Sequence, residues 1–259
     1  MGRISSSSIS RAVSPARLLP LMMVVALASP AAARCQDAPK PSVDWSGCGK
    51  EQLMLGETNL TGAVFTKASL TAGDFTRAAL AGARLSETEI TRTRFDGADL
   101  TGADFTRAIG WRTSFVGAVL DKAVLTLADM SRSRFTGARL IGANFAKAEL
   151  NRSDFSGADL TGADMSKAEL ARVSFVKARV GAVNFSQSNL ARAQLGGVKL
   201  EGANMAGTYL FRTQLQGADL SRATGLKQEQ LDIACGDRDT KLPAGLTPPK
   251  SWPCAADEE

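Results

Sequence analysis

The chain has 259 residues, of which 31 are Lys or Arg, 26 are Asp or Glu and none is His. A protein without His lacks the commonest general base and the commonest metal ligand, which excludes a Ser-His-Asp triad and His-ligated zinc or iron sites. With 44% hydrophobic residues and nearly balanced charge, the chain is too apolar to be disordered. It also has no uncharged apolar run of 18 or more residues that would span a membrane in the mature protein.

The N-terminus is typical of an export signal. Three arginines and no acid precede an apolar stretch over residues 18–28, and a run of three alanines ends at Ala33 as a small-residue cleavage site. We therefore expect residues 1–33 to be a signal peptide and the protein to be exported, either periplasmic or secreted. Removal of Arg3, Arg11 and Arg17 leaves 28 basic and 26 acidic residues, a net charge of about +2 that argues against nucleic-acid binding.

Export to an oxidising compartment predicts that the four cysteines form disulfides. Cys35 and Cys48 precede the regular region described next, and Cys235 and Cys254 follow it. We expect each pair to close a local loop of about 14 or 20 residues, worth about 3 kcal/mol in the chain-entropy model. Two alternatives are a long bridge between the ends of the molecule and a lipidated Cys35, which Arg34 disfavours because that position needs a small residue.

A period of five residues runs through the middle of the chain. From Leu55 to Leu220 every fifth residue is Leu, Ile, Val, Phe or Met, and Gly110 is the one exception among 34 positions. Two residues before these, from Thr58 to Ala218, 30 of 33 positions are Ala, Gly, Ser or Thr, and the others are Val173, Val183 and Val198. Neither the helix period of 3.6 nor the strand period of 2 fits, so the pattern predicts a solenoid with short straight segments and regular corners.

These residues resemble the pentapeptide repeat proteins, whose pattern is A-(D/N)-L-x-x. The pattern stands here as Ala98-Asp99-Leu100-Thr101-Gly102, Ala103-Asp104-Phe105-Thr106-Arg107, Ala158-Asp159-Leu160-Thr161-Gly162 and Ala218-Asp219-Leu220-Ser221-Arg222. The resemblance implies an all-β fold, a right-handed quadrilateral parallel β-helix with four pentapeptides in each coil. The large central residue and the small residue before it would point inward.

A second period of 20 residues supports four pentapeptides per coil independently. Phe recurs at positions 75, 95, 115, 135, 155 and 175, and gives way to Leu195 and Leu215. Such columns place like side chains above one another at about 4.8 Å. The 34 repeats predict about 8.5 coils. We expect an N-terminal cap over residues 34–54, the β-helix over residues 55–222 and a C-terminal cap over residues 223–259 with a short helix from Lys227 to Ala234, because both ends of a solenoid need polar caps.

The 20-residue period also predicts an arginine ladder on one face, at the candidate interaction residues Arg92, Arg112, Arg132, Arg152, Arg172, Arg192 and Arg212. One interpretation is a solvated face that neutralises itself, because Glu89, Asp129, Glu149 and Glu169 each precede one of these arginines by three residues. The other is a strip that binds anions or docks a protein.

Aromatic residues next to the ladder favour docking. Trp111, Tyr209 and Phe211 belong to the same face, and exposed Trp, Tyr and Arg are enriched at interface hot spots. Gly110 leaves a gap in the core just before Trp111, so the alternative is that Ile109 or Trp111 turns inward to fill it.

The sequence therefore predicts a non-catalytic exported rod, a structural or protein-binding module that docks an unidentified protein or anionic envelope component through its arginine face. We expect no enzyme activity, since a convex rod has no cleft in which to shift pKa values. We expect no cofactor, no metal, no nucleic acid and no transmembrane segment in the mature chain. The partner and the oligomeric state do not follow from the residues.

Two alternative functions remain. The resemblance implies that some members mimic duplex DNA and bind type II topoisomerases such as gyrase. Residues 55–222 carry 21 basic and 16 acidic side chains, however, which is the wrong sign for mimicry. The other alternative is adhesion to an anionic polymer or membrane surface through the arginines, which high salt would weaken.

Overall fold

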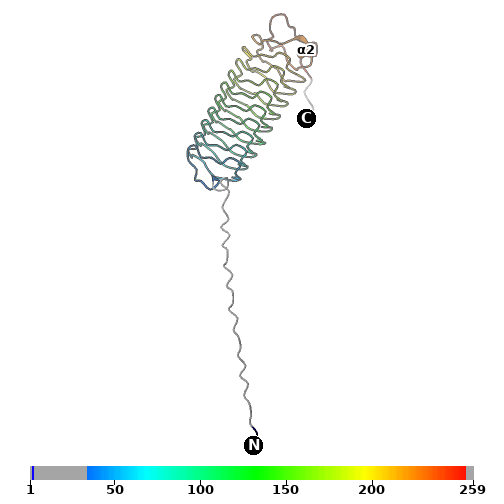
Figure 1. The fold of residues 1–259 in the computed structure, drawn as a ribbon. Helices are drawn as coiled ribbons and strands as arrows, with labels where there is room; N and C mark the ends of the chain where they lie inside the picture. The colour runs from blue at the N-terminus through cyan, green and yellow to red at the C-terminus, as the bar shows by residue number, and fades with distance from the viewer. Residues whose placement is uncertain (1, 3–33, 255–259) are drawn as a thin grey trace.

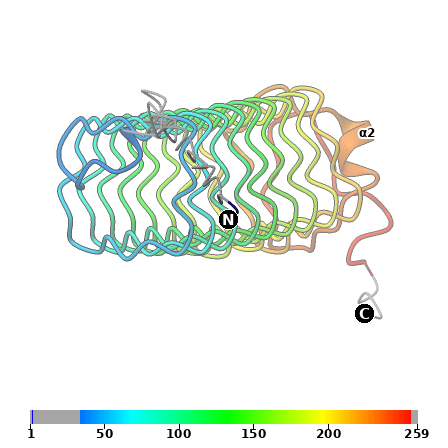
Figure 2. The same cartoon turned by 60° about the horizontal axis from the view of Figure 1, so that its bottom comes forward.

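The computed structural model describes Gly2 and residues 34–254, and the predicted signal peptide lies, apart from Gly2, outside the described residues. The described chain winds into a long right-handed quadrilateral β-helix, with the C-terminal cap at one end of the rod (Figure 1). Seen from a second direction, the successive coils lie parallel and in register along the rod (Figure 2). The predicted fold is therefore confirmed.

Parallel β-bridges hold each coil to the next. From Asp44–Val64 to Asn204–Thr224 every bridge joins residues 20 apart, which confirms four pentapeptides in each coil. No strand in the described residues is longer than one bridge residue, because a two-residue turn follows each straight segment of three residues. The backbone hydrogen bonds between coils are short, as in Leu100 N to Val119 O at 2.7 Å.

One pentapeptide, residues 103–107, shows how the sequence produces this geometry. Ala103 and Phe105 point inward and are fully buried, while Asp104 between them points outward and forms the bridge. The Asp104 carboxylate accepts a hydrogen bond from the backbone N–H of Thr106 at 2.9 Å. Asp and Asn favour such turns because their side chains satisfy the backbone two residues further on. Arg107 completes the corner with a φ of 59°.

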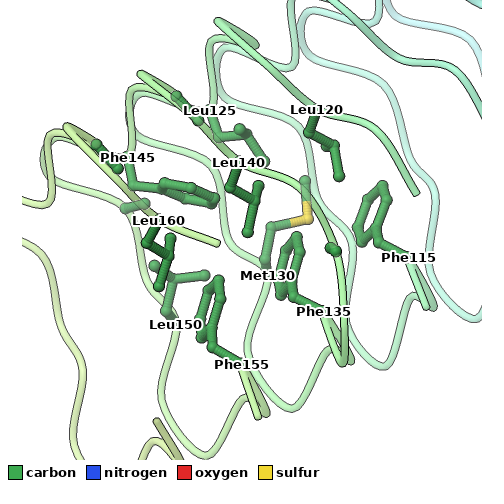
Figure 3. Packing of buried hydrophobic residues seen from close by; sticks show 14 of the residues in the cluster. Phe115, Leu120, Leu125, Met130, Phe135, Leu140, Phe145, Leu150, Phe155 and Leu160 are labelled. Carbon is green, nitrogen blue, oxygen red and sulfur yellow. The ribbon is translucent and has the colours of Figure 1, made fainter. Parts of the chain in front are cut away.

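The interior is a set of stacked columns of apolar side chains (Figure 3). Phe115, Phe135 and Phe155 are fully buried, with ring centroids 4.8 Å and 4.6 Å apart in nearly parallel planes. Phe145 of another column lies edge-on to Phe135 and Phe155, at 5.8 Å from each. Stacked and edge-to-face pairs are both favourable arrangements of aromatic rings.

Buried hydroxyls replace Ala at some small positions. Thr93 and Ser153 are buried, and each donates its hydroxyl to a backbone carbonyl of the preceding coil, Leu70 O at 2.8 Å and Met130 O at 2.9 Å. These bonds satisfy groups that would otherwise be buried without partners.

The coils begin earlier than the predicted boundary at Leu55. The regular turn pattern starts at residue 41, and Trp45 occupies a core position with 1% of its surface exposed. Trp45 lies edge-on to Phe65, and the Lys50 ammonium lies 4.2 Å from the centroid of its indole ring. Lys50 breaks the apolar five-residue pattern, which is why the sequence alone placed the start of the repeat too late.

The C-terminal cap closes the other end of the rod. Helix α2, Gln228–Leu231, is shorter than the predicted helix, and its Leu231 is fully buried. Gln230 donates to the Met205 and Thr208 carbonyls at 2.9 Å and 2.8 Å, so carbonyls near the end of the rod have partners. The Trp252 indole donates to Ala234 O at 2.8 Å.

The two predicted local disulfides are present. Cys35 pairs with Cys48 and Cys235 pairs with Cys254, at sequence separations of 13 and 19 residues. Each bridge therefore joins residues within one cap, and neither crosses the rod.

Candidate functional site

The seven arginines of the ladder lie along one corner of the rod. Each stands two residues after the centre of a pentapeptide, and the 20-residue register places each above the last. Their φ values lie between 52° and 60°, in the left-handed region. A residue with a Cβ adopts this conformation at a cost of about 1 kcal/mol. Neither the ladder's backbone conformation nor its cost was predicted from the sequence.

A second corner of the same rod shows which residue type this left-handed backbone conformation favours. Its equivalent positions are mostly glycine, with φ values from 64° to 69°, at Gly97, Gly117, Gly137, Gly157, Gly197 and Gly217. Glycine adopts positive φ without the Cβ penalty. We call these six residues the glycine corner. The coil also accepts longer side chains at such positions, as at Lys147 and Lys167 on a further corner, where φ is 60° and 59°.

The acids expected to neutralise the ladder do not contact it. Among the described residues, no carboxylate lies within 4 Å of the guanidinium group of Arg92, Arg112, Arg132, Arg152, Arg172 or Arg192. Asp129, Glu149 and Glu169 stack on one another through the bridge register instead. The Glu169 carboxylate accepts a hydrogen bond from the Asn189 amide at 2.8 Å.

Arginines on other faces do pair with acids from a neighbouring coil. Arg139 lies 2.6 Å from Asp121, and Arg94 lies 3.4 Å from Asp74. Arg77 pairs with Glu57 in the same way. The fold therefore allows an arginine to form an ion pair with an acid of a neighbouring coil. The six ladder arginines named above form no such pair with a described residue.

Trp111 and Ile109 are exposed on the arginine face, with 55% and 48% of their surfaces accessible. The Trp111 indole N–H donates to the Asp129 carboxylate. The alternative that one of them turns inward beside Gly110 is wrong. A Cβ on Gly110 would lie 2.5 Å from Met130 Sδ, so the methionine of the next coil fills the missing volume. Methionine suits this task because its side chain is unbranched and flexible.

A second apolar group lies at the C-terminal end of the same face. Tyr209 and Phe211 are 49% and 40% exposed, and their rings stack with centroids 6.2 Å apart. The backbone N–H of Arg212 donates to Ile233 O at 2.7 Å, which brings the 38% exposed Ile233 to the next level of the rod. We use the name arginine face for the seven arginines together with Ile109, Trp111, Tyr209 and Phe211.

Two carboxyl groups with a lowered pKa, those of Asp219 and Asp44, lie in turns and not among the arginine-face residues. The Ser221 hydroxyl and backbone N–H donate to Asp219 at 2.6 Å and 3.1 Å and lower the pKa of that carboxyl. Ser46 lowers the pKa of Asp44 through bonds of 2.5 Å and 3.0 Å. Hydrogen bonds to the ionised form have this effect, and here they stabilise turns.

The part of the chain that the structure describes contains no group of three His, Cys, Asp or Glu side chains placed to hold a metal ion. Within the same residues, no helix has the length and apolarity needed to cross a membrane.

Comparisons with known proteins follow the same repeat. A family model described as "Pentapeptide repeat region" matches residues 128–205. A second, "Pentapeptide repeats (8 copies)", matches residues 52–78, 74–107 and 188–224. No curated protein matches the chain.

Several solved structures are similar. HetL, a pentapeptide repeat protein involved in heterocyst differentiation regulation in the cyanobacterium Nostoc, is 26% identical over 78% of this chain and 94% of its own, with a TM-score of 0.40. A pentapeptide repeat protein of the Arabidopsis thaliana thylakoid lumen is 28% identical over 48% of this chain and 79% of its own, with a TM-score of 0.36. A trypsin-treated form of QnrB1, a plasmid-mediated fluoroquinolone resistance protein, is 18% identical over 66% of this chain and 91% of its own, with a TM-score of 0.37.

Proposed function

This chain belongs to the pentapeptide repeat family, and from that premise we propose that it is a non-catalytic, exported rod that docks a partner protein of the cell envelope through its arginine face. The partner's matching surface is acidic, since six guanidinium groups of the ladder lack a carboxylate from the described residues within 4 Å. Planar guanidinium groups bind carboxylates with two parallel hydrogen bonds, which gives such contacts their specificity.

The observation that carries the proposal is a ladder of six arginines that have no carboxylate partner among the described residues. Each arginine costs about 1 kcal/mol of backbone strain, and none of the six gains a compensating ion pair within the described residues. Stacked like charges about 5 Å apart also repel. Carboxylates supplied by a partner would neutralise this repulsion on binding.

The exposed aromatic residues support the same interpretation. Trp111 lies within the span of the ladder, and Tyr209 and Phe211 lie near its C-terminal end. Large exposed aromatics flanked by arginine are the composition of interface hot spots. The rigid coil holds these side chains at fixed spacing, which lowers the ordering cost of association.

Export is supported by the disulfides and by the sequence of the predicted signal. Disulfide bonds persist in oxidising compartments outside the cytosol, and the two bridges lie in the two caps. Topoisomerase mimicry is disfavoured by the excess of basic over acidic residues in the repeat, 21 against 16.

The test compares co-purification from the native envelope fraction. The wild-type protein should be recovered outside the cytosol, starting at Arg34, together with a stoichiometric partner. Reversal of three central charges by Arg132→Glu, Arg152→Glu and Arg172→Glu should abolish recovery of that partner while the rod stays folded by circular dichroism.

A matched control reverses three exposed basic residues off the arginine face, Arg84→Glu, Lys122→Glu and Lys250→Glu, and should retain the partner. Equal recovery with both triple variants would contradict docking through the ladder. A wild-type protein found in the cytosol with an intact leader would contradict export.

A further inference from the structure

Below the C-terminal cap, the hydrogen-bond ladder between the described coils is interrupted at one place, on a face away from the arginine ladder. On this face the central amide of each pentapeptide normally donates to the next coil, as in Leu160 N to Arg179 O and Leu200 N to Asp219 O, both at 2.8 Å. The equivalent bond from Val180 to Lys199 is not formed. The bridge between Arg179 and Lys199 is also missing, although Asp159–Arg179 and Lys199–Asp219 are present.

Two neighbouring bonds are lost at the same place. The bonds expected from Lys177 N to Gly196 O and from Lys199 N to Ala178 O are not formed between these described residues. Three backbone N–H donors and three carbonyl acceptors therefore lack coil partners within one short stretch. Outside this stretch the ladder is complete from Phe65 to Phe175.

The interruption coincides with a local change of sequence. Val198 occupies a column of small residues that is otherwise Ala in the coils below it, at Ala118, Ala138, Ala158 and Ala178. Val198 stands one coil after Ala178 in this column, and Ala178 is 7% exposed while Ala118 and Ala158 are fully buried. A column sized for Ala accepts extra methyl groups only if the backbone shifts.

A hollow of about 520 Å³ opens at this interruption. Its lining includes three cations, Lys177, Arg179 and Lys199, and two glycines, Gly181 and Gly197, that contribute no side chain. This volume lies within the range of small-molecule sites.

The hollow carries uncompensated positive charge. Lys177 and Lys199 have no ion pair with any described residue, and Arg179 has a long one, 3.7 Å from Asp159. The acid on the rim, Glu201, is paired with Arg222 of the next coil. Open backbone N–H groups beside ammonium groups form a concave site that attracts anions.

We propose that this hollow binds the phosphate group of a small phosphorylated compound. The ammonium groups of Lys177 and Lys199 and the open N–H groups contact the phosphate oxygens. The open carbonyls of Ala178, Gly196 and Lys199 accept hydrogen bonds from hydroxyl groups on the same ligand. This binding site is separate from the proposed docking face and does not depend on it.

The experiment titrates the disulfide-bonded mature protein with inorganic phosphate and, separately, with glycerol 3-phosphate, followed by calorimetry and by amide exchange. At least one compound should bind, and exchange of the Lys177, Val180 and Lys199 amides should slow on binding. Tighter binding of glycerol 3-phosphate would assign a phosphorylated polyol as the ligand, and equal binding would assign free phosphate.

The variant K177A/K199A should bind about tenfold more weakly. The control K147A/K167A removes two exposed lysines one coil apart, where the ladder is intact, as in Lys147 N to Ser166 O at 2.9 Å, and should bind as the wild type does. No binding of either compound, equal loss in both variants, or unchanged exchange of the three amides would overturn the proposal.

Discussion

Inside the rod, one column repeats phenylalanine from coil to coil, and each ring stabilises its neighbours: Phe115, Phe135 and Phe155 stack at 4.8 Å and 4.6 Å with no exposed surface. Along the arginine corner the repetition has the opposite effect, because each arginine adds a left-handed φ and a like charge. The comparison separates the residues that build the rod from those that the rod presents to solvent.

The largest expected effect lies in the interior. Phe135→Ala should lower the free energy of unfolding by about 3–5 kcal/mol, because it removes a buried ring and leaves a cavity between two stacked neighbours. Phe211→Ala, on the arginine face, should lower it by less than about 1 kcal/mol, since the ring is 40% exposed. Urea unfolding of both variants measures the difference, and equal losses would remove the distinction between core and face.

A smaller effect is expected where Met130 fills the space beside Gly110. Gly110→Ala should cost about 1–3 kcal/mol, because the added Cβ would lie 2.5 Å from Met130 Sδ and 3.0 Å from Ile90 Cγ1. Urea unfolding measures this loss. An unchanged free energy of unfolding in Gly110→Ala would mean that Met130 can move away from Gly110 without loss of packing.

The smallest expected change in stability compares the glycine corner with the arginine corner. Gly157→Ala should cost about 1 kcal/mol by backbone strain alone, because φ is 68° and no atom lies within 4 Å of the added Cβ. Arg152→Gly should cost nothing measurable, because relief of strain offsets the greater freedom of glycine in the unfolded chain. Thermal and urea unfolding test both. A loss above about 1 kcal/mol in Arg152→Gly would show that the arginine stabilises the rod and would weaken the docking proposal.

The periodic part of the fold was predictable because each buried position repeats the same requirement. A large apolar residue every five positions and a matching column every 20 predict the coil, its register and the stacking of Phe75 to Phe175. The local disulfides followed from the positions of the cysteines outside the repeat. Exposure of Trp111, Tyr209 and Phe211 on the arginine face agrees with the docking interpretation of the sequence.

Features that depend on a neighbouring coil were not predictable. Met130 fills the space beside Gly110 although the two residues are 20 apart in the sequence, and the sequence offered only the neighbours Ile109 and Trp111 as alternatives to fill that gap. Lys50 hid the first coil because a lysine stands at a position where the repeat normally has a large apolar residue. Val173, Val183 and Val198 all depart from the pattern of small residues in the sequence. The hydrogen bonds between coils are present around Val173 and Val183 but are missing beside Val198. Only the structure distinguishes them.

The hydrogen bonds between coils run along the rod, so a pulling force on its two ends would load successive coils in series. Strength in such an arrangement is set by the weakest layer. Residues 177–180 and 196–199 share the layer that lacks three of these bonds. Among the coils below the cap, we therefore expect the rod to yield first there under tension, leaving the long N-terminal stack of phenylalanine rings intact.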